Sequence, residues 1–457
     1  MDSLPNSPEA RDIAVHLHPY TDARRHQEIG PLVLDRGEGV HVFDAAGNRY
    51  LEALAGLWSV AVGFSEERLV EAAARQMRKL PYAHSFAHRS HGPVIDLAEK
   101  LIAMAPVPMS KAFFTNSGSE ANDTVMKLLW YRSNALGEPK RKKIISRLRG
   151  YHGITIASGS LTGLPYNHKS FDLPLPGVIH VGCPHFWREA HPGETEEAFA
   201  SRLAAELEET IEREGPDTIA AFIGEPVMGA GGVVVPPATY WEKIQQVLRR
   251  HAIPLVADEV ICGFGRTGRM FGCETYGITP DIMVLSKQLT SSYMPMAAVL
   301  VNAAIFEPIA DESHRIGTLG HGFTASGHPV AAAVALENLA IIEERDLVAQ
   351  AARVGAHLQR RLRGLADHPL VGEVRGIGMI AAVELVADKA GKAPHGTVGV
   401  LGRMGQAAAQ EAGVLVRPLG DTLAICPPLI ATETDADTVV DALATALAVV
   451  EGQLSQA

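Results

Sequence analysis

Cysteine is scarce in this chain, and what there is forms no recognisable pattern. The 457 residues include four cysteines, widely spaced and without a CxxC pair: Cys183, Cys262, Cys273 and Cys426. A disulfide framework or a structural zinc site needs closer and more regular spacing. The scarcity therefore predicts reduced thiols and a cytoplasmic protein.

An excess of basic charge is also missing. The sequence has 41 Lys and Arg against 52 Asp and Glu, a formal net charge of -11. Such a balance repels nucleic-acid backbones and offers no polybasic face to anionic lipid. We therefore expect neither nucleic acid nor membrane surface as a partner.

Long hydrophobic runs are lacking as well. The most apolar long stretch, residues 329–342, contains Glu337 and is shorter than the ~20 residues of a membrane span. It predicts a buried helix. The first residues, Met1-Asp2-Ser3-Leu4-Pro5, have no apolar core of an export signal, so none is expected.

What is present is a regular alternation of short apolar runs and longer periodic segments. This pattern is typical of parallel strands joined by helices. Seven strands are predicted, at 112–115, 143–146, 178–182, 219–224, 254–257, 282–286 and 297–301, with helices at 120–134, 196–214 and 238–251. The fold class is therefore α/β, with a mainly parallel seven-stranded sheet.

The pattern of apolar runs changes near residue 327, which indicates a second, smaller α+β domain. There we expect a long helix from Pro329, strands within 376–385 and 414–425, and a closing helix from about Thr434. The N-terminal segment reads as strands and turns and is expected to join this domain. The predicted division is 1–64 and 327–457 for the small domain and 65–326 for the large one.

Two predicted strands end in residues with ionisable side chains, at the same edge of the sheet. One ends in Ser286-Lys287, the other in Asp258-Glu259. Ligands of open α/β sheets bind at the carboxyl ends of strands. A lysine there is usually solvated, and a strand-end acid often only bonds a loop or forms half of an ATPase motif. The ATPase alternative fails because the sequence has no GxxxxGK[ST] loop.

A third segment, residues 115–122, turns from a strand through Ser117, Gly118 and Ser119 into a helix. Free N–H groups and the positive end of the helix dipole suit a phosphate, although an ordinary N-cap looks the same. A lysine, an acid and a phosphate seat together are what pyridoxal phosphate (PLP) requires, because the acid keeps its pyridine nitrogen protonated.

Two other patterns are weaker. Residues 263–268 match GxGxxG, but 269–280 lacks the helical periodicity that a dinucleotide site needs. His84, His88 and His91 lie close in sequence, but no HExxH or nearby carboxylate accompanies them. We interpret them as loop or interface histidines and predict no metal site.

The ordered motifs resemble those of class III aminotransferases of PLP fold type I, particularly the ω-amino acid or amine:pyruvate branch. They lie at 56–58, 113–122, 150–153, 224–227, 258–260, 286–287 and 321–324, so the resemblance spans nearly the whole chain.

The resemblance implies a role for each matching residue. Lys287 would form the Schiff base with PLP, Asp258 would pair with the pyridine nitrogen, and Tyr151 would hold the ring as a third catalytic residue. The further residues implied in cofactor binding are Gly118, Ser119, His152, Glu225, Val260 and Thr324, the last acting in the partner subunit of a homodimer that could pair into a tetramer. The implied substrate pocket is formed by Tyr20, Trp58, Phe86, Ala230 and Arg417. For the aromatic residues, plain packing is an equally good interpretation.

The implied reaction is ping-pong transfer of an amino group from a primary amine or ω-amino acid to a 2-oxo acid such as pyruvate. An aminomutase, a decarboxylating transaminase or a non-catalytic binding protein of the same fold remains open. The sequence departs from many relatives at Ser291-Ser292, where those carry glycines. The departure puts the substrate preference in doubt.

Overall fold

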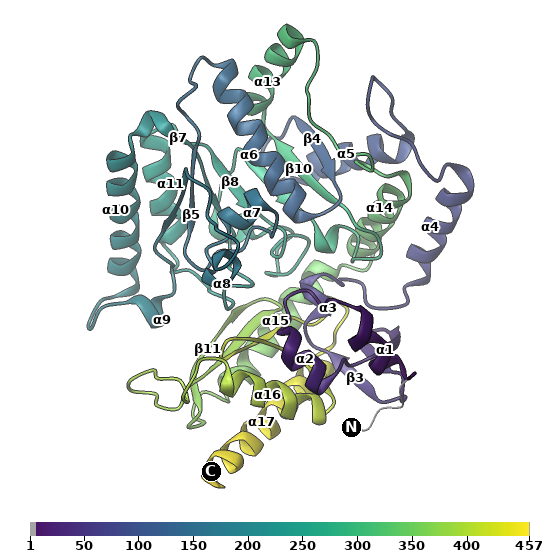
Figure 1. Cartoon of the computed structure of the whole chain (residues 1–457), viewed down its shortest axis with the longest axis vertical. Coiled ribbons are helices and arrows are strands. Elements are labelled where there is room, and N and C mark those ends of the chain that lie inside the picture. The colour runs from purple at the N-terminus through teal and green to yellow at the C-terminus, as the bar shows by residue number, and fades with distance from the viewer. Residues whose placement is uncertain (1–5, 457) are drawn as a thin grey trace.

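The computed structural model describes residues 6–456, so the first five residues, where no export signal is expected, lie outside it. A larger part, blue to green in Figure 1, lies above a smaller part that combines the purple N-terminal and the yellow C-terminal segments. The larger part contains a seven-stranded sheet, and two four-stranded sheets complete the fold.

The large sheet has the strand order β4-β10-β9-β8-β7-β5-β6. Strand β10 runs antiparallel to β4 and β9, and the pairs among β5 to β9 are parallel. All seven predicted strands are present: β4 (Lys111–Thr115), β5 (Lys143–Arg147), β6 (Val178–Val181), β7 (Ile219–Gly224), β8 (Leu255–Asp258), β9 (Ile282–Leu285) and β10 (Ala297–Val301). The predicted α/β fold with a mainly parallel sheet is confirmed.

These strands are apolar throughout because both faces of the sheet are buried. Along β9, Ile282 and Val284 join one apolar cluster, while Met283 and Leu285 join another. Successive side chains of a strand point to opposite faces. The same alternation decides whether Asp258, at the end of β8, or Glu259, directly after it, points toward the face covered by α6.

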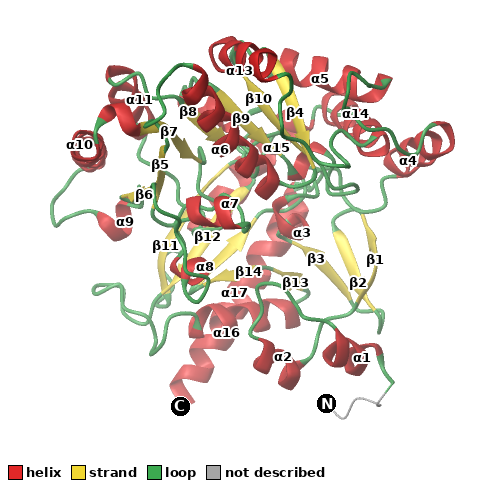
Figure 2. Ribbon diagram, turned by 45° about the horizontal axis from the view of Figure 1, so that its top comes forward, coloured by secondary structure: helices red, strands yellow, loops and turns green. Residues whose placement is uncertain are grey.

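Helices cover the two faces, as Figure 2 shows. The predicted helices at 120–134, 196–214 and 238–251 correspond to α6, α10 and α11. The helices of this part are α4 (Glu67–Lys79), α5 (Gly92–Met104), α6 (Gly118–Ala135), α7 (Ile156–Leu161), α8 (Pro165–His168), α9 (Phe186–Glu189), α10 (Glu196–Glu214), α11 (Tyr240–Arg250), α12 (Gly272–Tyr276), α13 (Ala303–Ile316) and α14 (Pro329–Glu344), with 3₁₀ turns at η1 (Pro216–Thr218) and η2 (Lys287–Leu289).

The smaller part contains elements from both ends of the chain. From the N-terminal end come α1 (Pro8–Val15), α2 (Ala23–Ile29), β1 (Leu34–Glu38), β2 (His41–Asp44), β3 (Arg49–Glu52) and α3 (Ala55–Trp58). From the C-terminal end come α15 (Leu347–Arg363), β11 (Val371–Ile377), β12 (Ile380–Leu385), α16 (Val400–Glu411), β13 (Val414–Leu415), β14 (Arg417–Leu419), β15 (Thr422–Ile425) and α17 (Glu433–Gln456). Strand β13 pairs in parallel with β3, in the sheet order β1-β2-β3-β13. The domain boundaries drawn from the sequence stay a prediction.

Three sequence expectations for this part are wrong in detail. The N-terminal segment, expected as strands and turns, also contains the helices α1, α2 and α3, of which Ser7 and Asp22 cap the first two. The segment 376–385 is not one strand, because it contains the turn between β11 and β12 at Gly378, whose φ is +55°. The segment 414–425 is three short strands. Turns inside apolar runs leave little trace in hydrophobic periodicity.

Helix α17 has the length and composition of a membrane-spanning helix. It packs on α15 and α16 and buries eight side chains, including Val439, Leu443 and Leu447. Burial within the fold accounts for its apolar character, and the core helices of other proteins share it.

Candidate active site

Lys287 lies directly after β9, at the start of the 3₁₀ turn η2. Its φ of +47° places it in the left-handed region, which is uncommon for a residue other than glycine. Its Nζ lies 5.9 Å from the centre of the Trp58 ring. Burial lowers the pKa of Lys287 to about 8, although the charges of Asp258 and Glu225 act in the opposite direction. About a tenth of this amine is therefore neutral, and nucleophilic, at pH 7.

Asp258 ends β8, and both of its carboxylate oxygens have hydrogen-bond partners. Its Oδ2 lies 2.7 Å from His152 Nδ1 and accepts a hydrogen bond from Asn122 Nδ2 at 3.0 Å, while Oδ1 accepts from the N–H of Val260 at 3.1 Å. Asp258 faces α6 because Val256, two residues earlier, belongs to the apolar cluster on that face. The side chain is buried, so these partners fix the direction of a charged carboxylate.

The first turn of α6 lies against the ends of β8 and β9. Ser117 caps the helix by accepting from the N–H of Glu120 at 3.2 Å. A Cβ on Gly118 would lie 3.4 Å from Val260 Cγ2 and 3.8 Å from the Cβ of Ser286. The helix N-terminus therefore reaches within van der Waals contact of the residue before Lys287. Ser119 Oγ accepts from the N–H of Ile154 at 3.2 Å.

Glu225, after β7, holds the loop that carries Tyr151. Its carboxylate accepts from the N–H of Tyr151 at 3.0 Å and of Gly229 at 2.9 Å. Burial raises the pKa of Glu225, and the nearby charge of Asp258 adds to the effect, while His152 opposes it. The structure therefore gives Glu225 a positioning contact to the backbone of Tyr151.

Aromatic rings and Arg417 form the wall near Lys287. The guanidinium of Arg417 lies 5.2 Å from the centre of the Trp58 ring and 5.9 Å from that of Tyr20, and Tyr20 meets Tyr151 edge to face at 6.5 Å. Ala230 packs against the apolar cluster that contains Trp58. Burial lowers the pKa of Arg417, and the ionisable groups that counter it are Tyr166, Tyr20 and Tyr151, none of them a carboxylate.

Two predicted site residues lie apart from this group. Phe86 is 48% exposed and packs directly on Gly322. Thr324 is exposed, and its carbonyl accepts from the hydroxyl of Tyr82 at 2.9 Å. Phe86, His88, Lys127 and His321 line an open depression of about 830 Å³. Within one chain, the described hydrogen bonds link neither residue to Lys287 or Asp258.

The family model for aminotransferase class-III matches residues 21–447. This chain belongs to the class III aminotransferases. Gamma aminobutyrate transaminase 1 of Solanum lycopersicum, a mitochondrial protein, is 49% identical over 93% of this chain and 82% of its own length.

Solved structures of omega transaminases are similar to this class III aminotransferase. The omega transaminase of Pseudomonas jessenii, in complex with PMP, is 62% identical, covers 98% of this chain and 99% of its own, and has a TM-score of 0.98. A transaminase solved with L-alanine is 68% identical, covers 93% and 100%, and has a TM-score of 0.92. The protein is a PLP-dependent aminotransferase, as the sequence predicts.

The residues present fit PLP. A lysine with a lowered pKa, a fixed carboxylate and a helix N-terminus meet at the carboxyl ends of β8 and β9. Beside Asp258, Asn122 Oδ1 and His152 Nε2 are buried without a hydrogen-bond partner among the described residues. A site that retains unsatisfied polar atoms next to its charged group is built to receive a polar ligand.

Sequence reasoning did not assign a role to Asn122. It lies one helical turn after Gly118 on α6, and its amide also donates to the carbonyl of His152 at 2.6 Å. The spacing from Gly118 was the available signal, because residues four apart share a helix face. Nothing in the sequence indicated that this face would meet β8.

Proposed function

We propose that this enzyme transfers an amino group from a primary amine or ω-amino acid to a 2-oxo acid, with pyruvate as the acceptor, in two half-reactions. The observation that carries the proposal is Arg417. Its guanidinium is largely buried between aromatic rings near Lys287 and has no carboxylate among the groups that act on it. A buried cation without a partner is costly, and a carboxylate substrate would supply one.

The relatives support this choice of substrates. A transaminase 68% identical to this chain was solved with L-alanine, which is the amination product of pyruvate. A thermostable omega transaminase 62% identical to it carries W58M, F86L and R417L and was engineered for asymmetric synthesis of enantiopure bulky amines. This chain has Trp58, Phe86 and Arg417 at the same numbers. The gamma-aminobutyrate transaminases among the relatives favour testing ω-amino acids as donors.

The roles of the site residues follow from their placement. Asp258, fixed by His152 and Asn122, would hold the protonated pyridine nitrogen. Gly118 and Ser119 would bind the phosphate, and Tyr151 and Val260 would lie on the two faces of the ring. Glu225 would position Tyr151 through its backbone. When bound, PLP supplies the electron sink for cleavage of the substrate C–H bond.

Lys287 would act twice. Its Nζ would hold the cofactor covalently and, as a free amine, would move a proton between the donor carbon and the cofactor. The lowered pKa of about 8 suits this task, because a general base works best when its pKa lies near the working pH. Arg417 would hold the acceptor carboxylate and swing aside for donors that lack one.

The two half-reactions test the proposal separately. In Arg417→Ala, KM for pyruvate should rise by roughly 10-fold or more, as expected for the loss of a charged hydrogen-bonded contact. The first half-reaction with a carboxylate-free amine should stay nearly normal. Stopped-flow absorbance measures each step, and Arg403→Ala, an exposed arginine on α16, is the control.

Equal damage to both half-reactions would show that Arg417 supports the fold or the cofactor. A wild-type enzyme that releases no free keto product from any donor would instead favour an aminomutase. A cofactor absorbance that does not respond to amines would indicate a binding protein.

A further inference from the structure

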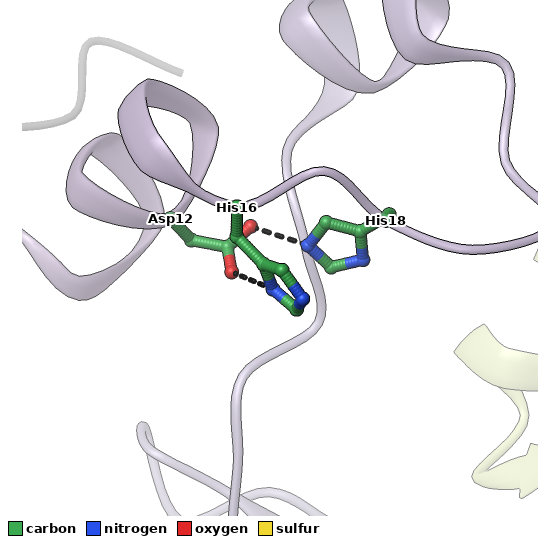
Figure 3. A group of neighbouring side chains, drawn as sticks. All are labelled: Asp12, His16 and His18. Atoms are coloured by element: carbon green, nitrogen blue, oxygen red, sulfur yellow. Dashed lines mark hydrogen bonds and ion pairs between the residues drawn. The ribbon is translucent and has the colours of Figure 1, made fainter.

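Three histidines converge on one carboxylate in the N-terminal segment, outside the site described above. Figure 3 shows Asp12 on α1 with His16 and His18 turned toward its two carboxylate oxygens. His16 Nδ1 lies 3.2 Å from Oδ1, and His18 Nε2 lies 2.7 Å from Oδ2. His26 Nε2, from α2, lies 3.1 Å from the same Oδ2.

The local structure explains this convergence. Asp12 and His16 are one helical turn apart, and the chain becomes extended at His16, with φ -104° and ψ 117°. Alternate residues of an extended chain point to the same side, so His18 joins His16. His26 is the buried residue of α2 and closes the group from the other side. Two short helices and the loop between them are thus tied at one point.

The donor set is that of a transition-metal site rather than of a calcium or magnesium site. Imidazole nitrogens with a carboxylate suit Zn²⁺, Cu²⁺, Ni²⁺ or Co²⁺, whereas Ca²⁺ and Mg²⁺ take oxygen ligands. The ring centres of His16 and His18 are 4.2 Å apart, and those of His18 and His26 are 4.1 Å apart.

The ligand atoms of Asp12, His16 and His18 are close enough to share one ion, since they all lie within 4.8 Å of one another. With metal–ligand bonds of ~2.0–2.1 Å, neighbouring ligand atoms lie about 3.3–3.4 Å apart. The separations of His16 and His18 from Asp12, 3.2 and 2.7 Å, need only a few tenths of an ångström of expansion. The side chains of Asp12 and His18 are 22% and 25% exposed, so an ion can enter from solvent.

We propose that Asp12, His16 and His18 form a binding site for a divalent transition metal of the zinc class, with His26 hydrogen-bonded to Asp12 beside it. These residues lie at both ends of the loop that carries Tyr20, whose ring contacts Tyr151 and Tyr166. A bound ion would join α1 to the loop, and would thereby fix Tyr20 at the wall of the active site. The metal site itself rests on these side chains and not on the proposed substrates.

Titration of the PLP-loaded enzyme with Co²⁺ tests the site directly. After chelator treatment and desalting, the wild type should bind one Co²⁺ per chain with the visible absorption of a four-coordinate imidazole site. The double variant His16→Gln/His18→Gln should bind at least ~10-fold more weakly, since even loss of a supporting contact costs a metal site 10–100-fold. His395→Gln, which changes an exposed histidine elsewhere, should bind like the wild type.

A second measurement follows how firmly the bound ion holds the N-terminal segment. Zn²⁺ should slow trypsin cleavage after Arg24 and Arg25, which are exposed on α2 next to His26, and should raise the thermal midpoint in the wild type but not in the double variant. Folding of the variant is checked by its PLP content. A wild type that binds no Co²⁺, or that loses no affinity in the double variant, would reduce the cluster to hydrogen bonds and overturn the proposal.

Discussion

Asp258 and Glu259 are adjacent acids at the end of one strand, yet they do different work. Asp258 points toward α6 and meets Asn122 and His152. Glu259 points to the opposite face, where it accepts from the N–H groups of Gly272 at 2.9 Å and Cys273 at 2.6 Å. Burial raises the pKa of Glu259 to about 7. Strand periodicity alone therefore separates a site residue from one that caps α12.

The pKa of Lys287 makes a signed prediction about cofactor loading. Only the neutral amine attacks the aldehyde of PLP, and burial lowers its pKa from 10.5 to about 8. The rate at which apoenzyme takes up PLP should therefore rise through pH 8 and level off above it. Asp258 favours the protonated amine and Arg417 disfavours it, so Asp258→Asn should move the inflection down and Arg417→Ala should move it up.

Stopped-flow absorbance of PLP uptake across pH measures these inflections. A free lysine derivative, which should react with an inflection near 10.5, corrects for the titration of PLP itself. Shifts of both variants in the same direction would contradict the opposite effects of the Asp258 and Arg417 charges on the pKa of Lys287.

The loop after η2 explains the two serines that stand where many relatives carry glycines. Ser291 and Ser292 have φ of +48° and +59°, in the region that favours glycine. The hydroxyl of Ser291 accepts from the N–H of Ala61 at 3.1 Å and of Val62 at 3.3 Å, and donates to Asn338 Oδ1 at 2.6 Å. Ser291 therefore ties the Lys287 loop to the segment that follows Trp58, while Ser292 is exposed.

The two positions should respond differently to glycine. In Ser292→Gly, relief of ~1–2 kcal/mol of left-handed strain is offset by the ~0.5–1 kcal/mol entropy cost of glycine, so stability should change little. In Ser291→Gly, two buried N–H groups lose their partner, at about 1–3 kcal/mol each. Thermal unfolding at one scan rate should place Ser291→Gly well below Ser292→Gly, and equal midpoints would show that the hydroxyl bonds contribute nothing.

At the level of helices and strands, the sequence predicted those elements whose hydrophobic period is clear. The seven strands and α6, α10 and α11 were found because each is long or apolar enough to show its period. The hairpin at Gly378 was not found because its short turn lies inside an apolar run. The three strands of 414–425 were not found because β13 pairs with β3 and β15 pairs with β12, both distant in sequence. The histidine cluster was missed for a related reason: Asp12 and His16 are one helical turn apart, but His26 meets Asp12 only through the loop between α1 and α2.

In the whole molecule, Thr324 and Phe86 are exposed and lie apart from Lys287 of the same chain. We therefore expect the active unit to be a homodimer in which Thr324 completes the phosphate site of the partner. Thr324→Ala alone should lose PLP faster than the wild type. Mixing it with Lys287→Ala should produce hybrid dimers with one intact site, because each subunit lends the residue that the other lacks.

Hybrids separated by a tag on one subunit, with PLP content and turnover measured over time, check this expectation. Hybrids no better than either parent, or a fully active monomer in sedimentation, would rule out the shared site. Refolded wild-type mixtures control for losses in preparation.

The pairing of β3 with β13 has a consequence for synthesis. Leu51 and Glu52 hydrogen-bond with a strand made almost at the end of translation. Until the ribosome has delivered residue 415, the sheet β1-β2-β3 has an open edge, and such edges are prone to pair with other chains. The nascent N-terminal segment, which includes Tyr20 and the histidine cluster, therefore cannot complete its sheet until the C-terminal segment has been made. Because non-local pairing slows folding, we expect the smaller part to be the last to fold.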